Sequence, residues 1–153
     1  RSNDVIWGML GANAVHMTYL HELIARAVGV PVGDYYVMSN NAHIYTSLPK
    51  FVEIMEYPAR VDYYGHKEFA PYPILQSDET YEQLLKDCSD FIEHGNLTTY
   101  RTRWMLEVVD WMSLAYSHYK MGDTDAAYRF VGNIQAMDWR VACREWLNRR
   151  VNT

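Results

Sequence analysis

The first 28 residues place the strongest constraint on the fold, because they combine an extended run with a helical repeat. Val5-Ile6-Trp7 is β-branched and aromatic, which predicts a strand over residues 1–8. From Leu10 onward, apolar residues recur at three- and four-residue steps, which predicts an amphipathic helix over residues 11–28. The chain therefore begins with a strand that is followed directly by a helix.

Turn residues end this helix and open a second extended region. Gly29 can cap the helix and Pro31 prevents its continuation. Residues 34–46 are rich in tyrosine and β-branched residues, interrupted at Ser39-Asn40-Asn41, which predicts extended structure. We expect both extended regions to lie in one sheet with the helix packed on it, which gives an α+β fold.

The rest of the chain divides into an aromatic loop and a helical tail. Residues 58–77 contain several prolines among tyrosines, after a predicted short helix at 49–55 and with room for a short strand near 60–64. Residues 78–153 predict a three-helix extension. Its helices are expected from Ser77 or Asp78 to Gly95, from Thr98 or Thr99 to Met121, and from Gly122-Asp123 through Leu147. We expect Trp104, Trp111 and Trp139 to be buried between these helices.

Composition limits the classes of function. The chain has 153 residues, of which 49% are hydrophobic and 22% charged, so it can bury a core and is not disordered. No apolar run has the length of a membrane span, and the net charge of −5 gives no general attraction to nucleic acid. Cys88 and Cys143 lack CxxC spacing, which favours reduced thiols in a cytoplasmic protein. We therefore expect neither a membrane nor a nucleic-acid partner.

Three short motifs carry the functional argument. Arg1-Ser2-Asn3-Asp4 combines a cation, a hydroxyl and a carboxylate, a grouping suited to an anionic ligand, although a solvated polar terminus is the alternative. Asn13 follows, and His43 and Tyr45 alternate on one face of the second extended region. No metal site is predicted: His21-Glu22 begins like a zinc-protease helix, but Ala25 stands where the second histidine is needed.

These motifs resemble, in order and nearly in spacing, the second half of the thymidylate synthase family. The wording is closest to phage-type members, which include the deoxynucleotide hydroxymethylases. The likeness covers residues 1–57, followed by the loop at 58–77 and a tail at 78–153 without a recognised counterpart. The Pro-Cys-His segment that carries the family's nucleophile does not occur in the chain. We therefore expect either a fragment whose N-terminal half is absent or a degenerate member.

The resemblance implies a role for each motif residue. Arg1 and Ser2 would bind the nucleotide phosphate, with Asn3 beside them. Asp4 would contact the folate pterin and the network around the pyrimidine, and Trp7 and Gly8 would border the folate site. Asn13 would bind the base, and His43 and Tyr45 would bind the sugar 3′-hydroxyl. Asp4 and Asn13 are thus the candidate catalytic residues.

The implied reaction transfers a one-carbon unit from 5,10-methylenetetrahydrofolate to C5 of a deoxypyrimidine monophosphate in a homodimer. An amide at Asn13 can pair with both N3–H and O4 of uracil, which favours dUMP over dCMP. The sequence leaves open whether methyl or hydroxymethyl is delivered. It also leaves open a non-catalytic nucleotide-binding or protein-interaction module, in which the tyrosine- and tryptophan-rich helical tail docks a partner protein. The turn at Tyr119–Asp123 resembles a single tetratricopeptide-type turn, but a lone unit cannot build a solenoid. A phage-encoded protein would act in the host cytoplasm.

Overall fold

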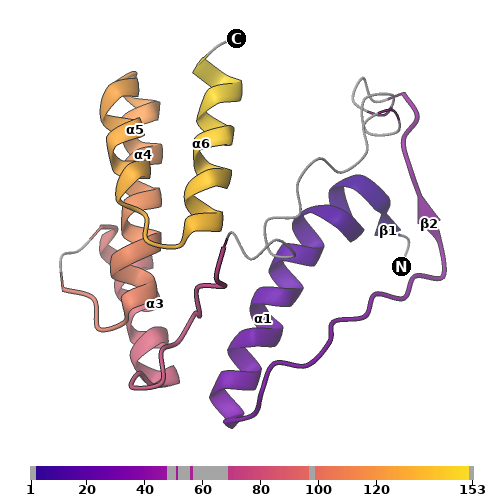
Figure 1. The fold of residues 1–153 in the computed structure, drawn as a ribbon, viewed down its shortest axis with the longest axis horizontal. Coiled ribbons are helices and arrows are strands. Elements are labelled where there is room, and N and C mark those ends of the chain that lie inside the picture. The colour runs from indigo at the N-terminus through magenta and orange to yellow at the C-terminus, as the bar shows by residue number, and fades with distance from the viewer. Residues whose placement is uncertain (1–2, 48–50, 52–55, 57–68, 97–98, 152–153) are drawn as a thin grey trace. The chain divides into compact units, whose positions relative to one another are not determined.

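A computed structural model of the chain describes residues 3–47, 51, 56, 69–96 and 99–151 (Figure 1). The chain divides into two compact units, unit 1 over residues 1–62 and unit 2 over residues 63–153. The expected short helix at 49–55 falls almost wholly outside the described residues. Arg1, Ser2 and the expected strand near 60–64 lie outside them as well.

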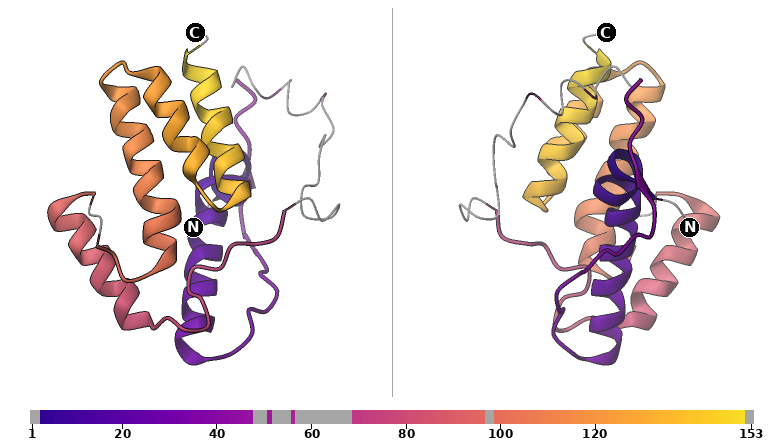
Figure 2. Two further views of the ribbon diagram at one scale, coloured as in Figure 1. Left: turned by 60° about the vertical axis from the view of Figure 1, so that its left-hand side comes forward. Right: turned by 90° about the vertical axis from the view of Figure 1, so that its right-hand side faces the viewer.

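Unit 1 contains a pair of short parallel strands beside a helix. Strand β1 (Asn3–Asp4) pairs with β2 (Ala42–His43), so that Asn3 lies opposite Ala42 and Asp4 lies opposite His43. The extended chain that follows helix α1 (Asn13–Val28) runs back along this helix to reach β2 (Figures 1 and 2). The two regions predicted to be extended therefore do meet in parallel, although over two residues each.

The predicted strand over residues 1–8 is wrong beyond Asp4. Residues Val5–Ala12 form η1, a wide π-helical segment that is interrupted at Gly11. Asp4 is extended and its carboxylate accepts the backbone N–H of Trp7, which caps this segment. This local cap overrides the β-preference of the Val5-Ile6-Trp7 run. The stretch from Tyr35 to Met38, also predicted as strand, is irregular.

Helix α1 ends where the turn residues predicted. Gly29 is left-handed (φ 73°) and its N–H donates to the carbonyls of Ala25 and Arg26. A side chain would strain this conformation, since only glycine adopts it readily. The predicted C-terminal cap is therefore confirmed.

Unit 2 is helical in the residues described. Its elements are α3 (Tyr81–His94), η2 (Met105–Val109), α4 (Asp110–Lys120), α5 (Thr124–Asn133) and α6 (Met137–Val151). Helices α4 and α5 form a hairpin that turns at Gly122 (φ 83°), and α6 packs beside α5 (Figures 1 and 2). Because η2 runs directly into α4, the described part of the tail has four helical rods rather than the three that the sequence predicted.

The additional rod arises from a break in the predicted last helix. Ile134 is extended and fully buried, and the next residue, Gln135, donates its N–H to the carbonyl of Glu107 at 3.0 Å. Arg140 Nε donates to the Ile134 carbonyl at 2.6 Å. These are contacts with other parts of unit 2. In the sequence, Gly132-Asn133 directly precedes the break.

The start of α3 and the start of the following helix also differ from expectation. Thr80, rather than Ser77 or Asp78, caps α3, and it exchanges hydrogen bonds with Gln83 in a capping box. The next helix begins at Arg103, whereas the prediction was Thr98 or Thr99. Gly95 ends α3 as predicted.

The tryptophans of unit 2 hold its helices together. Trp104 is buried and meets Trp139 edge-on, with 5.5 Å between ring centroids. Trp111 is partly buried and stacks on Phe130 at 6.0 Å. The expectation that these rings lie between helices is confirmed, with full burial at Trp104 alone. None of the helices in the described ranges has the length and apolar character needed to cross a membrane.

Candidate functional site

The parallel strand pair of unit 1 brings together residues from two of the sequence motifs. Because Asp4 lies opposite His43 in the register, the two side chains meet. Asp4 Oδ2 lies 4.0 Å from His43 Nε2, and the Asp4 side chain is 13% exposed whereas that of His43 is 35% exposed. The site therefore has a sheltered carboxylate next to an accessible imidazole.

Tyr45 extends this group along the chain. Its ring lies edge-on to that of His43, with 5.1 Å between centroids and an interplanar angle of 86°. Tyr45 is 54% exposed. The His-x-Tyr motif thus presents two polar rings on one side, as its alternation predicted, and both can reach a ligand hydroxyl.

The carboxylate of Asp4 has one oxygen occupied and one available. Oδ1 accepts the N–H of Trp7, whereas Oδ2 is buried and has no hydrogen-bond partner within the described part of the chain. A buried carboxylate oxygen without a partner costs about 1–3 kcal/mol or more. This arrangement favours a ligand that brings a hydrogen-bond donor to Oδ2.

The segment after Asp4 presents Trp7 and buries Gly8. Trp7 is 65% exposed, so its indole face can stack on a flat ring. Gly8 is buried and its carbonyl accepts the N–H of Asn13. A Cβ at Gly11 would lie 2.6 Å from the carbonyl oxygen of Ile6, so this turn requires glycine. The motif Gly8-Met-Leu-Gly11 was the available signal for this constraint.

Asn13 begins α1 with an exposed side chain. The hydrogen bond from its backbone N–H to the Gly8 carbonyl ties its position to η1. Asn3 contributes its backbone to β1. The structure thus unites Asp4, Trp7, His43 and Tyr45, while Arg1 and Ser2 lie outside the described residues.

Ser39 was not predicted as a site residue. Its Oγ is buried and without a hydrogen-bond partner among the described residues, and it lies shortly before β2. Ser39-Asn40-Asn41 stands where the family resemblance leads one to expect Gly-Gly-Asp. This departure from the family pattern was the signal that could have drawn attention to it.

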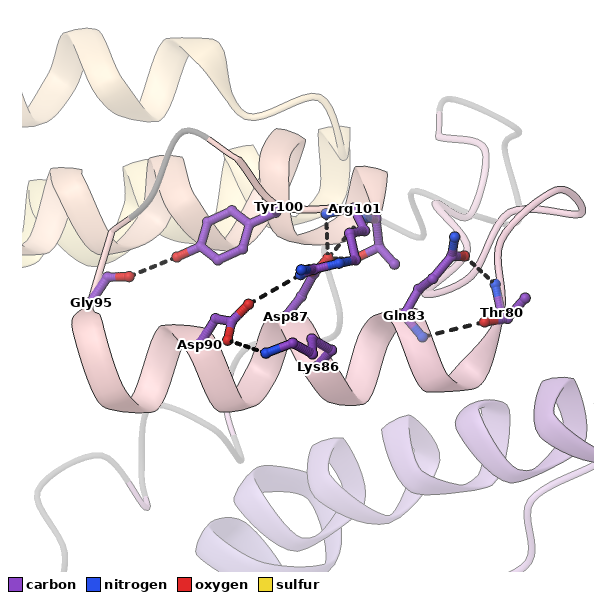
Figure 3. A network of polar contacts seen from close by, with 9 residues as sticks. Thr80, Gln83, Lys86, Asp87, Asp90, Gly95, Tyr100 and Arg101 are labelled. Carbon is purple, nitrogen blue, oxygen red and sulfur yellow. Dashed lines mark hydrogen bonds and ion pairs between the residues drawn. The ribbon is translucent and has the colours of Figure 1, made fainter.

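Unit 2 contains a buried polar network of a different kind (Figure 3). Asp87 on α3 is fully buried, and its carboxylate accepts the backbone N–H groups of Arg101 and Thr102, both at 2.7 Å, and the hydroxyl of Thr102 at 2.8 Å. The Arg101 guanidinium bridges Asp87 and Asp90. Every oxygen of Asp87 is satisfied, so this network joins α3 to the start of the next helix and leaves no acceptor for a ligand.

The two cysteines lie in unit 2 and are poor nucleophiles. Burial, followed by the charge of Asp87, raises the pKa of Cys88 above its usual value. Burial raises the pKa of Cys143 to about 11. Because a thiol with a raised pKa stays protonated at neutral pH, neither is activated for addition. Within the described residues, no three His, Cys, Asp or Glu side chains are grouped to hold a metal ion.

Comparison with known proteins finds similarity to phage enzymes. A deoxyuridylate hydroxymethyltransferase of Pseudomonas phage M6 is 35% identical over 162 aligned residues, which cover 98% of this chain and 46% of that protein. The chain is therefore similar to this phage enzyme over nearly its whole length. A deoxyuridylate hydroxymethyltransferase of Bacillus phage SP01 is 42% identical over 45 residues, or 29% of this chain and 12% of that protein. The resemblance drawn from the motifs is thereby confirmed.

The chain spans about half the length of the M6 relative, so that relative contains residues without a counterpart in this chain. No protein-family model matches the chain, and no solved structure does. The match nevertheless includes most of the sequence of unit 2, because it covers 98% of the chain.

Proposed function

We propose that this chain supplies the nucleotide-binding part of a deoxyuridylate C5 hydroxymethyltransferase. The observation that carries the proposal is its similarity, over 98% of its residues, to a protein of that name. The meeting of Asp4 with His43 and Tyr45 supports it, because two motifs distant in the sequence form one polar group. We further propose that β1 and β2 belong to a larger sheet of the thymidylate synthase kind.

The family resemblance gives each motif residue a role. Arg1 and Ser2 bind the phosphate, and His43 and Tyr45 donate to or accept from the 3′-hydroxyl. Asn13, which is exposed at the start of α1, pairs with N3–H and O4 of uracil. The base is therefore uracil rather than cytosine, in agreement with the substrate in the names of both relatives.

The residues around Asp4 fit the pterin of a folate. The buried Oδ2 of Asp4 can accept a ring N–H, and Trp7 presents an exposed aromatic face beside it. Methylenetetrahydrofolate supplies a one-carbon unit at the oxidation level of formaldehyde. Asp4 and Trp7 would orient that unit toward C5 of the pyrimidine. The hydrogen bond from the Trp7 backbone N–H to Oδ1 holds the Asp4 carboxylate in place.

Addition of the unit to C5 requires a thiolate at C6. Burial raises the pKa of both Cys88 and Cys143, which disfavours a thiolate at either position. We therefore expect the 153-residue chain to bind dUMP without turning it over. In the full product of its gene, we expect hydroxymethylation because the relatives carry that name. In that reaction water, rather than hydride, adds to the exocyclic methylene carbon on C5. Mass spectrometry of the product nucleotide distinguishes the two additions.

The base preference tests this assignment. Asn13→Asp should shift binding from dUMP toward dCMP, because a carboxylate accepts from the exocyclic amine of cytosine and repels O4 of uracil. One mispaired polar contact is worth about 1–3 kcal/mol, or roughly 5- to 150-fold in affinity. Arg1→Ala should weaken both nucleotides equally, since it meets only the phosphate. Calorimetric titration of both nucleotides measures these changes, and an unaltered preference in Asn13→Asp would rule out its contact with the base.

We propose in addition that the protein is a homodimer. Helix α1 exposes an apolar stripe at helical spacing, formed by Met17 (49% exposed), Leu20 (44%), Ile24 (54%) and Val28 (67%). An exposed apolar surface of this kind typically marks an interface. Sedimentation of the full gene product as a monomer at high concentration would contradict the dimer.

A further inference from the structure

The buried carboxylate oxygen of Asp4 and the imidazole of His43 lie close together without a hydrogen bond between them. Oδ2 of Asp4 has no hydrogen-bond partner among the described residues, and Nε2 of His43 lies 4.0 Å from it. This distance is about 1 Å longer than a usual N–H···O hydrogen bond. A small movement of the imidazole is therefore enough to complete the missing bond.

Of the two side chains, His43 is the one with room to move. The Asp4 side chain is 13% exposed and its Oδ1 accepts the N–H of Trp7, whereas the His43 side chain is 35% exposed. The parallel pairing of β1 and β2 keeps the two residues side by side (Figure 1). The ring of Tyr45 meets that of His43 edge-on. The carboxylate is thus a fixed acceptor, and the imidazole is a movable donor beside it.

Asp4 is the charged group that faces His43 within the described part of unit 1. Asp4 and His43 are the two ionisable residues of β1 and β2, and η1 has no ionisable side chain. The acidic and basic residues of α1, which packs on η1, are His16, His21, Glu22 and Arg26. His16 and Arg26 are exposed, and the ring of His21 lies against that of Tyr35. The phenol of Tyr45 is the remaining titratable group in contact with His43.

The charge of the imidazole determines how strongly it competes for Oδ2. A neutral imidazole has one N–H, on either nitrogen, whereas an imidazolium donates from both nitrogens. A hydrogen bond from an imidazolium to a carboxylate is roughly twice as strong as one between neutral groups. Histidine side chains generally change their charge between about pH 5 and pH 8. Competition for Oδ2 should therefore increase as the pH falls through this range.

We propose that His43 is a pH-dependent gate over the ligand-accepting oxygen of Asp4. The protonated imidazole closes onto Oδ2 with a charge-assisted hydrogen bond and excludes the ring N–H of a pterin, and the neutral imidazole yields this oxygen to the ligand. The inference rests on the proposed function, in which Asp4 binds the pterin of a folate. It accounts for a carboxylate oxygen that is buried beside a movable donor and still has no partner.

The test measures folate binding at two pH values in the full product of the gene. Folic acid is titrated calorimetrically, without nucleotide, at about pH 7.5 and about pH 5.5, between which a histidine generally becomes charged. We expect the affinity of the unmodified protein to fall roughly tenfold at the lower pH, the scale of one charge-assisted hydrogen bond. His43→Phe keeps a ring against Tyr45 but cannot donate or titrate, so its affinity should change much less between the two pH values.

Two further variants control this comparison. His43→Gln retains a polar side chain without a titrating charge and should also lose the pH dependence, so the test does not depend on the folding of His43→Phe. His94→Phe replaces an exposed histidine of unit 2 and should keep the pH dependence of the unmodified protein. Since folic acid titrates identically in every experiment, differences between variants at one pH report on the protein.

Asp4→Asn separates the inference from the proposed function. It should weaken folic acid at both pH values, because the amide presents a weaker acceptor to the pterin N–H. If Asp4→Asn weakens folate while the His43 variants keep the full pH dependence, the inference fails and the proposed function stands. An unmodified protein whose folate affinity is equal at both pH values, or higher in acid, also overturns the inference. If Asp4→Asn binds folate as tightly as the unmodified protein, or if neither binds it, the proposed role of Asp4 fails and the inference fails with it.

Discussion

The two units bury their side chains to very different degrees. Unit 2 has a core of fully buried apolar residues drawn from all its helices, including Leu84, Val108, Ala127, Ile134 and Leu147. Within the described part of unit 1, Ala25 is the one apolar side chain in the same class, and α1 exposes its apolar stripe. Unit 2 is therefore a structure complete in itself, whereas unit 1 presents surface that remains to be covered.

The buried polar groups of the two units also differ in how fully they are hydrogen-bonded. The buried Asp87 of unit 2 is fully hydrogen-bonded, whereas both buried oxygens without partners in the described ranges lie in unit 1, at Asp4 and Ser39. A satisfied network stabilises a fold, and an unsatisfied one costs stability unless a ligand or partner completes it. The comparison agrees with the proposal that unit 1 binds the nucleotide, while the satisfied network of unit 2 supports its fold.

The largest effect on this comparison is expected from Asp87→Ala. It leaves the N–H groups of Arg101 and Thr102 without their acceptor in a buried place, so the free energy of unfolding of unit 2 should fall by about 3–5 kcal/mol. Denaturant unfolding measures the change. Glu93→Ala, at an exposed position of the same helix, is the control and should stay within about 0.5 kcal/mol. Similar small effects in both variants would show that the network does not support unit 2.

A smaller effect is expected in unit 1 from Gly11→Ala. The new Cβ would lie 2.6 Å from the Ile6 carbonyl oxygen, so the backbone of η1 must shift, at a cost of about 1–3 kcal/mol. Because Asn13 follows closely, dUMP affinity should fall as well. Gly33→Ala is the matched control, since open space surrounds it. Equal unfolding midpoints for the two variants would mean that the turn at Gly11 tolerates a side chain.

Local sequence signals predicted those parts of the fold that local interactions determine. The cap at Gly29, the end of α3 at Gly95 and the turn at Gly122 depend on glycine at left-handed or otherwise unusual backbone positions, and all three are where the sequence indicated. The break before α6 was missed although Gly132-Asn133 precedes it. A glycine inside a helical pattern does not by itself end a helix, and the break also depends on the burial of Ile134 and on a hydrogen bond from Gln135 to the remote Glu107 carbonyl.

The candidate site shows the same division. The motifs predicted that His43 and Tyr45 act together, and their rings are in contact. The helical path after Asp4 was missed, because the Val5-Ile6-Trp7 run has strand propensity and the cap by Asp4 outweighs it. Ser39 was missed because a sequence does not show which hydroxyl becomes buried, although the Ser39-Asn40-Asn41 departure from the family pattern marked the segment.

The exposed stripe of α1 provides a third way to test the comparison. The double variant Leu20→Gln, Ile24→Gln should leave the free energy of unfolding of the monomer nearly unchanged, because both side chains are already about half exposed. It should weaken self-association by about tenfold or more, since each apolar side chain buried at an interface contributes about 1 kcal/mol or more. Leu85→Gln, on an exposed position of unit 2, is the control and should not affect association. Sedimentation equilibrium over a range of concentrations compares the variants, and equal dissociation constants would place the interface elsewhere.

The smallest effect is expected in acid and concerns the α4–α5 turn of unit 2. Asp123 caps α5, and the N–H of Ala126, followed by His118, holds the pKa of this carboxyl below its usual value of 3.8. Because the folded protein binds this proton less readily than the unfolded chain, the stabilisation is fully present above about pH 4 and is lost as the pH falls through the folded pKa. Asp123→Ser keeps a capping oxygen without a titrating charge, so it should retain most of the stability at neutral pH. Between about pH 5 and pH 2 it should lose stability less steeply than the unmodified protein. This range runs from about one unit above the usual pKa of an aspartate to below it. Thermal unfolding as a function of pH measures the slope, and identical slopes for Asp123→Ser and the unmodified protein would show that the charge of Asp123 contributes nothing to the turn.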